Sequence, residues 1–349
     1  MVAEHRWHLH GQARWLADGI GDGRAIRHQH GDDEVVDRPK RELITFDRRS
    51  VRLDGCVFTP GLAALIDPVS IAELRSRFAR DEPFVVHGMK DSVAALFAIP
   101  FLSSLDALLG SWPDQVHVHL PDVADEASTV TAAPHDARKM FANGMGLLFD
   151  EAQRFAPQLV PWLDAIRADV GLSALTQQRC LIYATPAGKG TAAHFDQNVN
   201  FVLHLHGTKT WWLAPNRNVA HPMTRHTLGQ PIDPELHTYA RLPMPEHLPP
   251  DRTEIVLEPG SLLFVPRGVW HATHAASDAL SLNFTFSPPT WIDVFTTALR
   301  SRLALSSDWR ATAAPLAVAT FEALLKELAD DAPHWNATDI LATTEASDR

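Results

Sequence analysis

Residues 191 to 200 read Thr191-Ala-Ala-His194-Phe-Asp196-Gln-Asn-Val-Asn200 and place a His-x-Asp pair in an apolar, alternating run. Side chains along an extended strand repeat every second residue. We therefore expect His194 and Asp196 on the same face of a strand, where they can hold one cation between them. A third ligand for that cation must come from another part of the chain.

The best candidate for the third ligand is His271, at the end of the run Gly260-Ser-Leu-Leu-Phe-Val-Pro-Arg-Gly-Val-Trp-His271. This run combines a turn glycine, an apolar strand, a Pro-x-Gly turn and a histidine at the start of the next strand. Proline presets φ and glycine permits positive φ, so the turn is expected to direct His271 inward. Two imidazoles and one carboxylate form the facial triad of non-haem Fe(II) sites, which leaves open positions on the metal. A purely structural His271, or His274 as the ligand, are the alternatives.

Composition sets broad limits on the function. The chain has 349 residues, 45% of them hydrophobic, and a formal net charge of −11, which is typical of a soluble globular protein of one large or two ordinary domains. The acidic balance argues against general nucleic-acid binding and suits a small molecule or a basic protein partner. Only two cysteines are present, far apart, so we expect no disulfide framework or thiolate zinc site and a cytoplasmic location. No run reads as a membrane span or an export signal.

The first half of the chain divides into a polar leader and a mixed region. Residues 1–42 mix charges, glycine and histidine (His5, His8, His10, His28, His30) and are interpreted as solvated. In residues 43–177 the pattern predicts helices at 70–80, 102–109 and 155–170, the first of them with Ser70 as N-cap. It predicts strands at 51–53, 83–88 and 115–120. Residues 122–136 are predicted to form a loop. His117 and His119 share one face of the last of these strands. We interpret them as its polar face, because no third ligand follows at short range.

Between residues 178 and 287 the apolar residues recur at every second position, in place of the helical spacing of the preceding segment. Strands are predicted at 179–185, 191–196, 200–206, 208–214, 254–258, 261–265, 269–274 and 279–286, and so many short strands with Gly and Pro turns predict a barrel or jelly roll. An insertion at 215–251 has a length typical of lids and binding segments. Residues 288–349 predict helices at 291–305 and 314–328 that pack on the barrel or form a homodimer contact, with a loose tail beyond residue 336.

Together these residues resemble the JmjC and ribosomal-oxygenase branch of the cupin superfamily, the Fe(II)- and 2-oxoglutarate-dependent oxygenases. The likeness runs from about residue 181 to 286, and Gly144–Asp150 is similar to the family's lead-in. It implies a mainly β fold with flanking helices (α+β), namely a double-stranded β-helix of the jelly-roll or cupin type. It also implies that His194, Asp196 and His271 bind iron, and that 2-oxoglutarate and O2 are converted to succinate and CO2 while a substrate is hydroxylated.

The resemblance also assigns residues to the co-substrate. The family binds the distal carboxylate of 2-oxoglutarate with a Lys or Arg on the strand after the His-x-Asp pair, and Lys209 stands at the matching place. A cation inside an apolar barrel needs an anionic partner, which a dicarboxylate would supply. The alternative is a surface lysine at a strand end. Four further residues match hydrogen-bond donors of similar enzymes, although each could be an ordinary polar strand residue: Tyr183, Thr191, Asn200 and Asn283.

The substrate is left open by the sequence. The resemblance implies hydroxylation of a protein or peptide side chain, with Arg or His of a ribosomal protein as one candidate. Residues 288–349 are short for the family's usual dimerisation helices plus a winged-helix module, so a hydroxylase of a small molecule or a natural-product peptide is an alternative. A cupin metalloprotein that does not use 2-oxoglutarate would need no buried cation at Lys209. A non-catalytic binding barrel would not need all three metal ligands.

Overall fold

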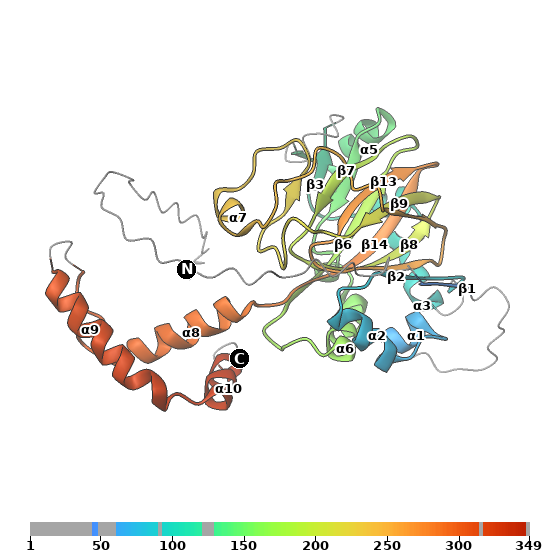
Figure 1. Cartoon of the computed structure of the whole chain (residues 1–349). Coiled ribbons are helices and arrows are strands. Elements are labelled where there is room, and N and C mark those ends of the chain that lie inside the picture. Colours follow the sequence, from blue (N-terminus) through green and yellow to red (C-terminus); the bar gives the residue numbers. More distant parts are fainter. Residues whose placement is uncertain (1–43, 48–60, 90–92, 121–128, 314–316, 347–349) are drawn as a thin grey trace. The chain divides into compact units, whose positions relative to one another are not determined.

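A computed structural model describes residues 44–47, 61–89, 93–120, 129–313 and 317–346 (Figure 1). The polar leader expected at 1–42 and the strand expected at 51–53 lie outside these residues.

Eight strands in the second half of the chain form two facing antiparallel sheets. The larger sheet contains, in spatial order, β12 (Leu262–Val265), β8 (Val199–His206), β14 (Ala279–Ser287) and β6 (Gln177–Thr185). The smaller sheet contains β7 (Gly190–Phe195), β13 (Trp270–Ala275), β9 (Lys209–Ala214) and β11 (Thr253–Leu257). Successive strands mostly alternate between the two sheets, as in a double-stranded β-helix. The predicted fold class is therefore confirmed.

The larger sheet continues beyond the barrel on both sides. Next to β6 lie β5 (Gly146–Phe149), β3 (Val116–His119) and β4 (Thr129–Ala132), and next to β12 lie β2 (Phe84–His87) and β1 (Ile44–Asp47). The loop expected at 122–136 is wrong from residue 129 onward. Residues 129–132 pair with β3, and Pro134 occupies the first turn of α5 (Pro134–Ala142), a position that tolerates proline.

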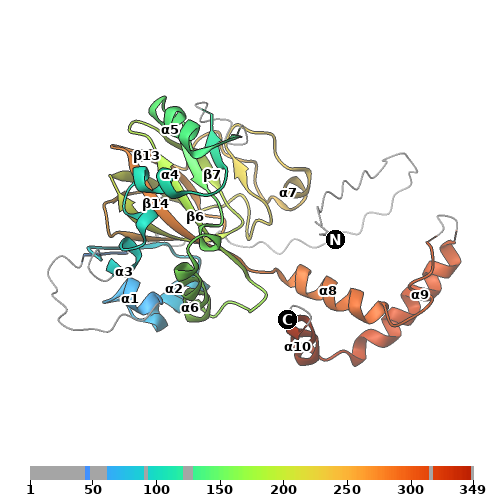
Figure 2. The ribbon, with the colours of Figure 1, turned by 180° about the vertical axis from the view of Figure 1, so that it is seen from behind.

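Helices of the N-terminal half cover the outer face of the larger sheet. They are α1 (Leu62–Ile66), α2 (Ile71–Ala79), α3 (Ala94–Phe97), α4 (Leu105–Ser111), α5 and α6 (Val160–Val170), with short 3-10 turns at Pro100–Leu102, Ala152–Arg154 and Pro157–Leu159. Their apolar faces share one core with β2, β8, β12 and β14, and both views show α1, α2 and α6 grouped together (Figures 1 and 2). Ser70 caps α2 as predicted, because its side chain accepts a hydrogen bond from the Glu73 N–H at 3.1 Å.

Strand β8 is buried on both faces and separates this outer core from the inside of the barrel. Phe201 and Leu203 point into the outer core, whereas Val202 packs inside the barrel with Trp211 and Leu263. This inner cluster fills only part of the space between the sheets. Polar side chains line the remaining space, which forms a cavity of about 320 Å³.

The insertion at 215–251 has structure of its own. It contains the short strand β10 (His226–Thr227), which pairs with β7 at the edge of the smaller sheet, and the helix α7 (Pro234–Tyr239). Leu236 of α7 packs with Phe195 and Trp270 on the outer side of that sheet. The insertion therefore covers the edge of the strand that carries His194.

Three helices follow the barrel: α8 (Trp291–Leu303), α9 (Val318–Asp331) and α10 (Ala337–Ala346), with a 3-10 turn at Ala332–His334. The loose tail expected beyond residue 336 is wrong, because residues 337–346 are helical. Large apolar side chains on α8 and α9 are exposed, among them Trp291 at 79% and Phe321 at 55%. The expected homodimer contact stays a prediction. Among the described residues, no helix has both the length and the apolar character needed to cross a bilayer.

Gly190 fixes how closely β7 approaches β13, which carries His271. A Cβ atom at residue 190 would lie 1.8 Å from the carbonyl oxygen of Thr273, whereas one at Gly110, an exposed position of α4, would meet nothing within 4 Å. Gly190→Ala should lower the free energy of unfolding by about 1–3 kcal/mol, because the strands must move apart. Gly110→Ala should raise it by about 0.5–1 kcal/mol. Urea denaturation of the two variants tests this, and equal midpoints would contradict the close approach.

Candidate active site

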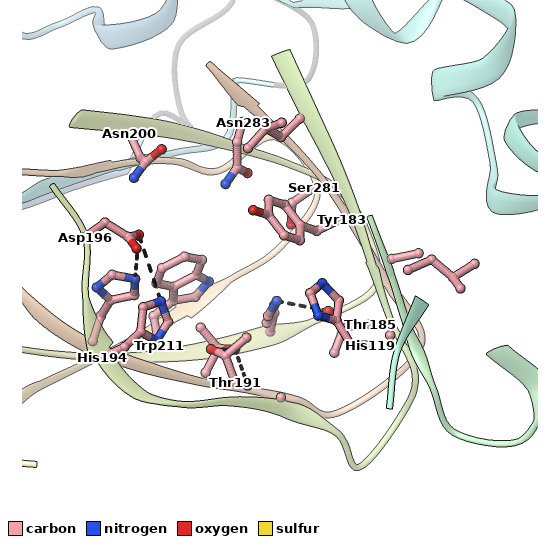
Figure 3. Close-up of a pocket in the computed structure, with 18 of the residues that line it drawn as sticks. His119, Tyr183, Thr185, Thr191, His194, Asp196, Asn200, Trp211, Ser281 and Asn283 are labelled. Atoms are coloured by element: carbon pink, nitrogen blue, oxygen red, sulfur yellow. Dashed lines mark hydrogen bonds and ion pairs between the residues drawn. The ribbon is translucent and has the colours of Figure 1, made fainter. Parts of the chain in front are cut away.

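The structure brings the three predicted metal ligands together, and Figure 3 shows His194 and Asp196 at one end of the cavity. His194 on β7 stands opposite His271 on β13, and Asp196 directly follows β7. Asp196 Oδ2 lies 3.6 Å from His271 Nε2 and 3.9 Å from His194 Nε2. One possible ligand atom of each residue lies within 4.8 Å of the others. His274, the alternative ligand, is on the exposed face of β13.

Hydrogen bonds prepare both imidazoles for a metal. His194 Nδ1 lies 2.7 Å from the carbonyl oxygen of Ala192, and His271 Nδ1 lies 2.9 Å from that of Val269. A carbonyl oxygen only accepts, so each Nδ1 carries the proton and each Nε2 presents its lone pair to the site. Burial holds the pKa of His271 well below its ordinary value, which keeps this ring neutral. Two imidazoles and a carboxylate are a donor set that fits Fe(II).

A β-bulge allows Thr191 to reach the cavity. Thr191 and His194 are three residues apart, so strict alternation would place them on opposite faces of β7. On β13, however, the partners of these two residues are Thr273 and His271, which are only two residues apart. The additional residue in β7 restores the common face. Thr191 and Thr273 then meet through their hydroxyl groups at 2.8 Å.

Arg225, from the insertion, contacts the carboxylate of Asp196. In the pairing of β10 with β7, His226 stands opposite Phe195, so Arg225 comes next to Asp196. Arg225 Nε lies 3.2 Å from Asp196 Oδ1. The two oxygens of Asp196 therefore have separate partners: Oδ1 faces the guanidinium and Oδ2 faces the imidazoles. Sequence analysis missed Arg225, because no local pattern shows which residue of a long insertion pairs with β7.

Lys209 lies inside the barrel, away from the metal ligands. Its side chain is buried, and Nζ donates a hydrogen bond to Thr185 Oγ1 at 3.0 Å and lies 5.7 Å from the centre of the Trp211 ring. Burial lowers the pKa of Lys209 to about 8. Among the residues that the structure describes, no carboxylate forms an ion pair with it. The surface-lysine alternative therefore does not hold, and the ammonium group is placed to bind an anion.

The four softer predictions also line the cavity, together with the metal ligands. Asn200 Oδ1 accepts a hydrogen bond from Thr285 Oγ1 at 2.8 Å, which leaves its NH2 group for other partners. Asn283 Oδ1 is buried without a hydrogen-bond partner among the described residues. Burial raises the pKa of Tyr183, so its phenol stays protonated and can donate. Thr191 completes the set.

Other lining residues were not predicted. The polar and charged ones are His119, Arg179, Thr185, Lys189, Gln197, Asn198, Arg225, Thr273, Ser281 and Thr285. Three of them could have been predicted, because side chains two residues apart on a strand share a face. Thr273 is two residues from His271, and Ser281 and Thr285 are each two residues from Asn283. His119 was interpreted only as part of a polar strand face. The remaining positions depend on pairings between strands that are distant in sequence.

Comparisons with known proteins agree with this architecture. A family model described as the JmjC domain matches residues 152–294. An uncharacterized protein of Bacillus subtilis (strain 168), YxbC, is 31% identical over 255 residues, which cover 71% of this chain and 77% of that protein. Ribosomal oxygenase 1 of Gallus gallus is 29% identical over 241 residues, or 64% of this chain and 35% of that protein. The chain thus spans about a third of the length of that ribosomal oxygenase.

A solved structure of ycfD from E. coli covers 74% of this chain and 67% of its own length, with 16% sequence identity and a TM-score of 0.48. The residues that match the JmjC-domain model include all eight barrel strands and the three predicted metal ligands. The chain therefore belongs to the JmjC-domain family.

Proposed function

We propose that this oxygenase holds Fe(II) through His194, Asp196 and His271 and uses 2-oxoglutarate and O2 to hydroxylate a side chain of a protein or peptide. The observation that carries the proposal is Lys209, a buried cation without a carboxylate partner among the described residues, in the same cavity as the three ligands. A cupin that binds a metal without 2-oxoglutarate has no need of this charge.

The proposed roles follow from the positions of the side chains. Nε2 of His194 and of His271 and Oδ2 of Asp196 would bind the metal, and Lys209 would bind the far carboxylate of 2-oxoglutarate. With Fe(II) bound, one oxygen atom of O2 enters succinate, CO2 leaves, and the other oxygen atom becomes the hydroxyl group of the product. Trp211 stacks on His271 with ring centres 5.6 Å apart and planes 20° apart, which holds this imidazole in place.

The other polar side chains of the cavity would orient the metal ligand and the co-substrate. Arg225 would keep Asp196 Oδ1 away from the metal, so that the carboxylate binds through Oδ2 alone and the other coordination positions stay open. Thr191, Tyr183, Asn200 and Asn283 would donate hydrogen bonds to the co-substrate or to the ligand shell. Because these side chains come from four strands of the two sheets, the folded barrel already holds them around the cavity.

Anaerobic titration tests the cofactor assignment. Fe(II) with 2-oxoglutarate should give the visible charge-transfer band of this enzyme class, and succinate should form under air. Asp196→Ala should abolish metal-supported turnover. Lys209→Ala should raise the Kd for 2-oxoglutarate by about tenfold or more, because a charge-assisted contact is lost. The exposed Lys326→Ala is the matched control. No band at saturating ligand and no succinate would refute the assignment and leave a different cupin metalloprotein or a binding barrel.

Arg225 can be tested through metal binding. Arg225→Gln should raise the Kd for Co(II), a spectroscopic substitute for Fe(II), by about tenfold or more, the usual effect of losing a group that orients a metal ligand. Arg217→Gln is the control, since Arg217 belongs to the same insertion but pairs with Asp251 at 2.7 Å. The measurement is a Co(II) absorption titration of the two variants. Equal Kd values would show that Arg225 does not position Asp196.

The proposed substrate class is supported by relatives that are ribosomal oxygenases by name. An Arg or His side chain of a ribosomal protein is one candidate. The charges of the cavity favour a second candidate: the lining includes Arg179, Lys189 and Arg225, but Asp196 is its only carboxylate. An entering guanidinium would meet like charges. A neutral or acidic group, on a peptide or a small molecule, would not.

Mass spectrometry after reaction under heavy O2 decides between the candidates. The enzyme would be incubated separately with ribosomal proteins and with a small-molecule extract, and Asp196→Ala serves as the inactive control. We expect one heavy oxygen atom in a polypeptide side chain, and a label on Arg or His would support the first candidate. A label on a neutral or acidic side chain, or one confined to small molecules, would instead support the second candidate. If succinate forms but neither pool is labelled, both candidates are wrong.

A further inference from the structure

His119 stands in a row of residues that crosses three strands of the larger sheet. His119 on β3 is paired with Gly146 on β5. β5 pairs in turn with β6, where Leu147 stands opposite Ala184 and Leu148 opposite Tyr183. Continuing this register by one residue puts Gly146 opposite Thr185. Residues in such a row share one face of the sheet. His119 and Thr185 therefore point to the same side, and both line the cavity.

The residue between them is a glycine, which leaves room for the imidazole. A Cβ atom at Gly146 would lie 3.9 Å from both Cβ and Cδ2 of His119. The ring therefore extends across Gly146, and no side chain separates it from Thr185. Thr185 is the residue that accepts a hydrogen bond from Lys209 Nζ at 3.0 Å. Figure 3 shows His119 and Thr185 together, at the opposite end of the cavity from Asp196.

The imidazole of His119 lacks a partner in the described structure. Its Nδ1 atom is buried and has no hydrogen bond to any described residue. Such a buried polar atom is costly unless a ligand or water satisfies it. Burial and the positive charges of Arg225 and Lys209 lower the pKa of His119, so the free ring is neutral and carries one N–H donor.

Resting on the proposed function, we infer that His119 is a further ligand of the co-substrate and donates a hydrogen bond to the distal carboxylate of 2-oxoglutarate beside Lys209 and Thr185. The carboxylate offers several acceptor sites, so one cation, one hydroxyl and one imidazole can bind it together. His119 lies outside residues 152–294, which match the JmjC domain. The N-terminal strands thus contribute a side chain to the co-substrate end of the barrel.

Binding of two 2-oxo acids to His119→Ala tests this role. The Kd is measured anaerobically with Fe(II) from the charge-transfer band, for 2-oxoglutarate and for 2-oxopentanoate, which has a methyl group in place of the distal carboxylate. His119→Ala should raise the Kd for 2-oxoglutarate by about tenfold or more, the effect of one hydrogen bond to a charged group. It should leave the Kd for 2-oxopentanoate unchanged. His117→Ala, on the same strand but outside the cavity lining, should change neither value.

The outcomes separate this inference from the proposed function. No band with the unmutated protein would remove the proposed function and the role of His119 with it. A band with an unchanged Kd for 2-oxoglutarate in His119→Ala would remove the role of His119 alone. An equal rise of the Kd for both 2-oxo acids would assign His119 to the shape of the cavity and would also overturn the inference. Thermal unfolding of the metal-free variants checks that each one is folded.

Discussion

The antiparallel pairing of β7 with β13 is the constraint on which the site depends. It places His194 directly opposite His271, and the two rings lie with their centres 4.1 Å apart. Each ring is fixed by a backbone carbonyl two residues before it in the chain, so the strand geometry determines both the position and the tautomer of the ligand. A shift of one strand by one residue in this register would turn the imidazole of that strand to the outer face and separate it from its partner. The bulge at Thr191 and the close approach at Gly190 belong to the same pairing.

A second constraint is the separation of charge along the cavity. Asp196 and the imidazoles occupy one end, and Lys209 occupies the other, with Trp211 between them in contact with His271 and Lys209. A buried ammonium group without an anionic partner is costly. Asp196 meets Arg225 through Oδ1, and its Oδ2 faces the imidazoles. The proposed divalent metal at one end would bind Oδ2, and the proposed dicarboxylate would reach from the metal to Lys209 and supply the anion that this ammonium group needs.

The sequence was sufficient for the parts of the site that depend on local pattern. The period of two located the eight barrel strands, and it placed His194 and Asp196 on one face because only strand geometry is needed for that. The Pro-x-Gly turn directed His271 inward for an equally local reason. Thr191 was predicted only from the family resemblance, and strict alternation would have excluded it, because the bulge that admits it becomes visible only in the pairing with β13.

Arg225 and His119 could not be predicted, and the reason is the same for both. Each reaches the cavity from a strand outside the eight of the barrel: Arg225 precedes β10 at the free edge of the smaller sheet, and His119 lies on β3 at the extended side of the larger one. Their positions depend on pairings between distant segments, which local periodicity does not encode. Strands outside the barrel can change their side chains without disturbing the register of β7 and β13. The barrel therefore fixes the three predicted metal ligands, while segments outside it add side chains at both ends of the cavity, Arg225 beside Asp196 and His119 at the opposite end.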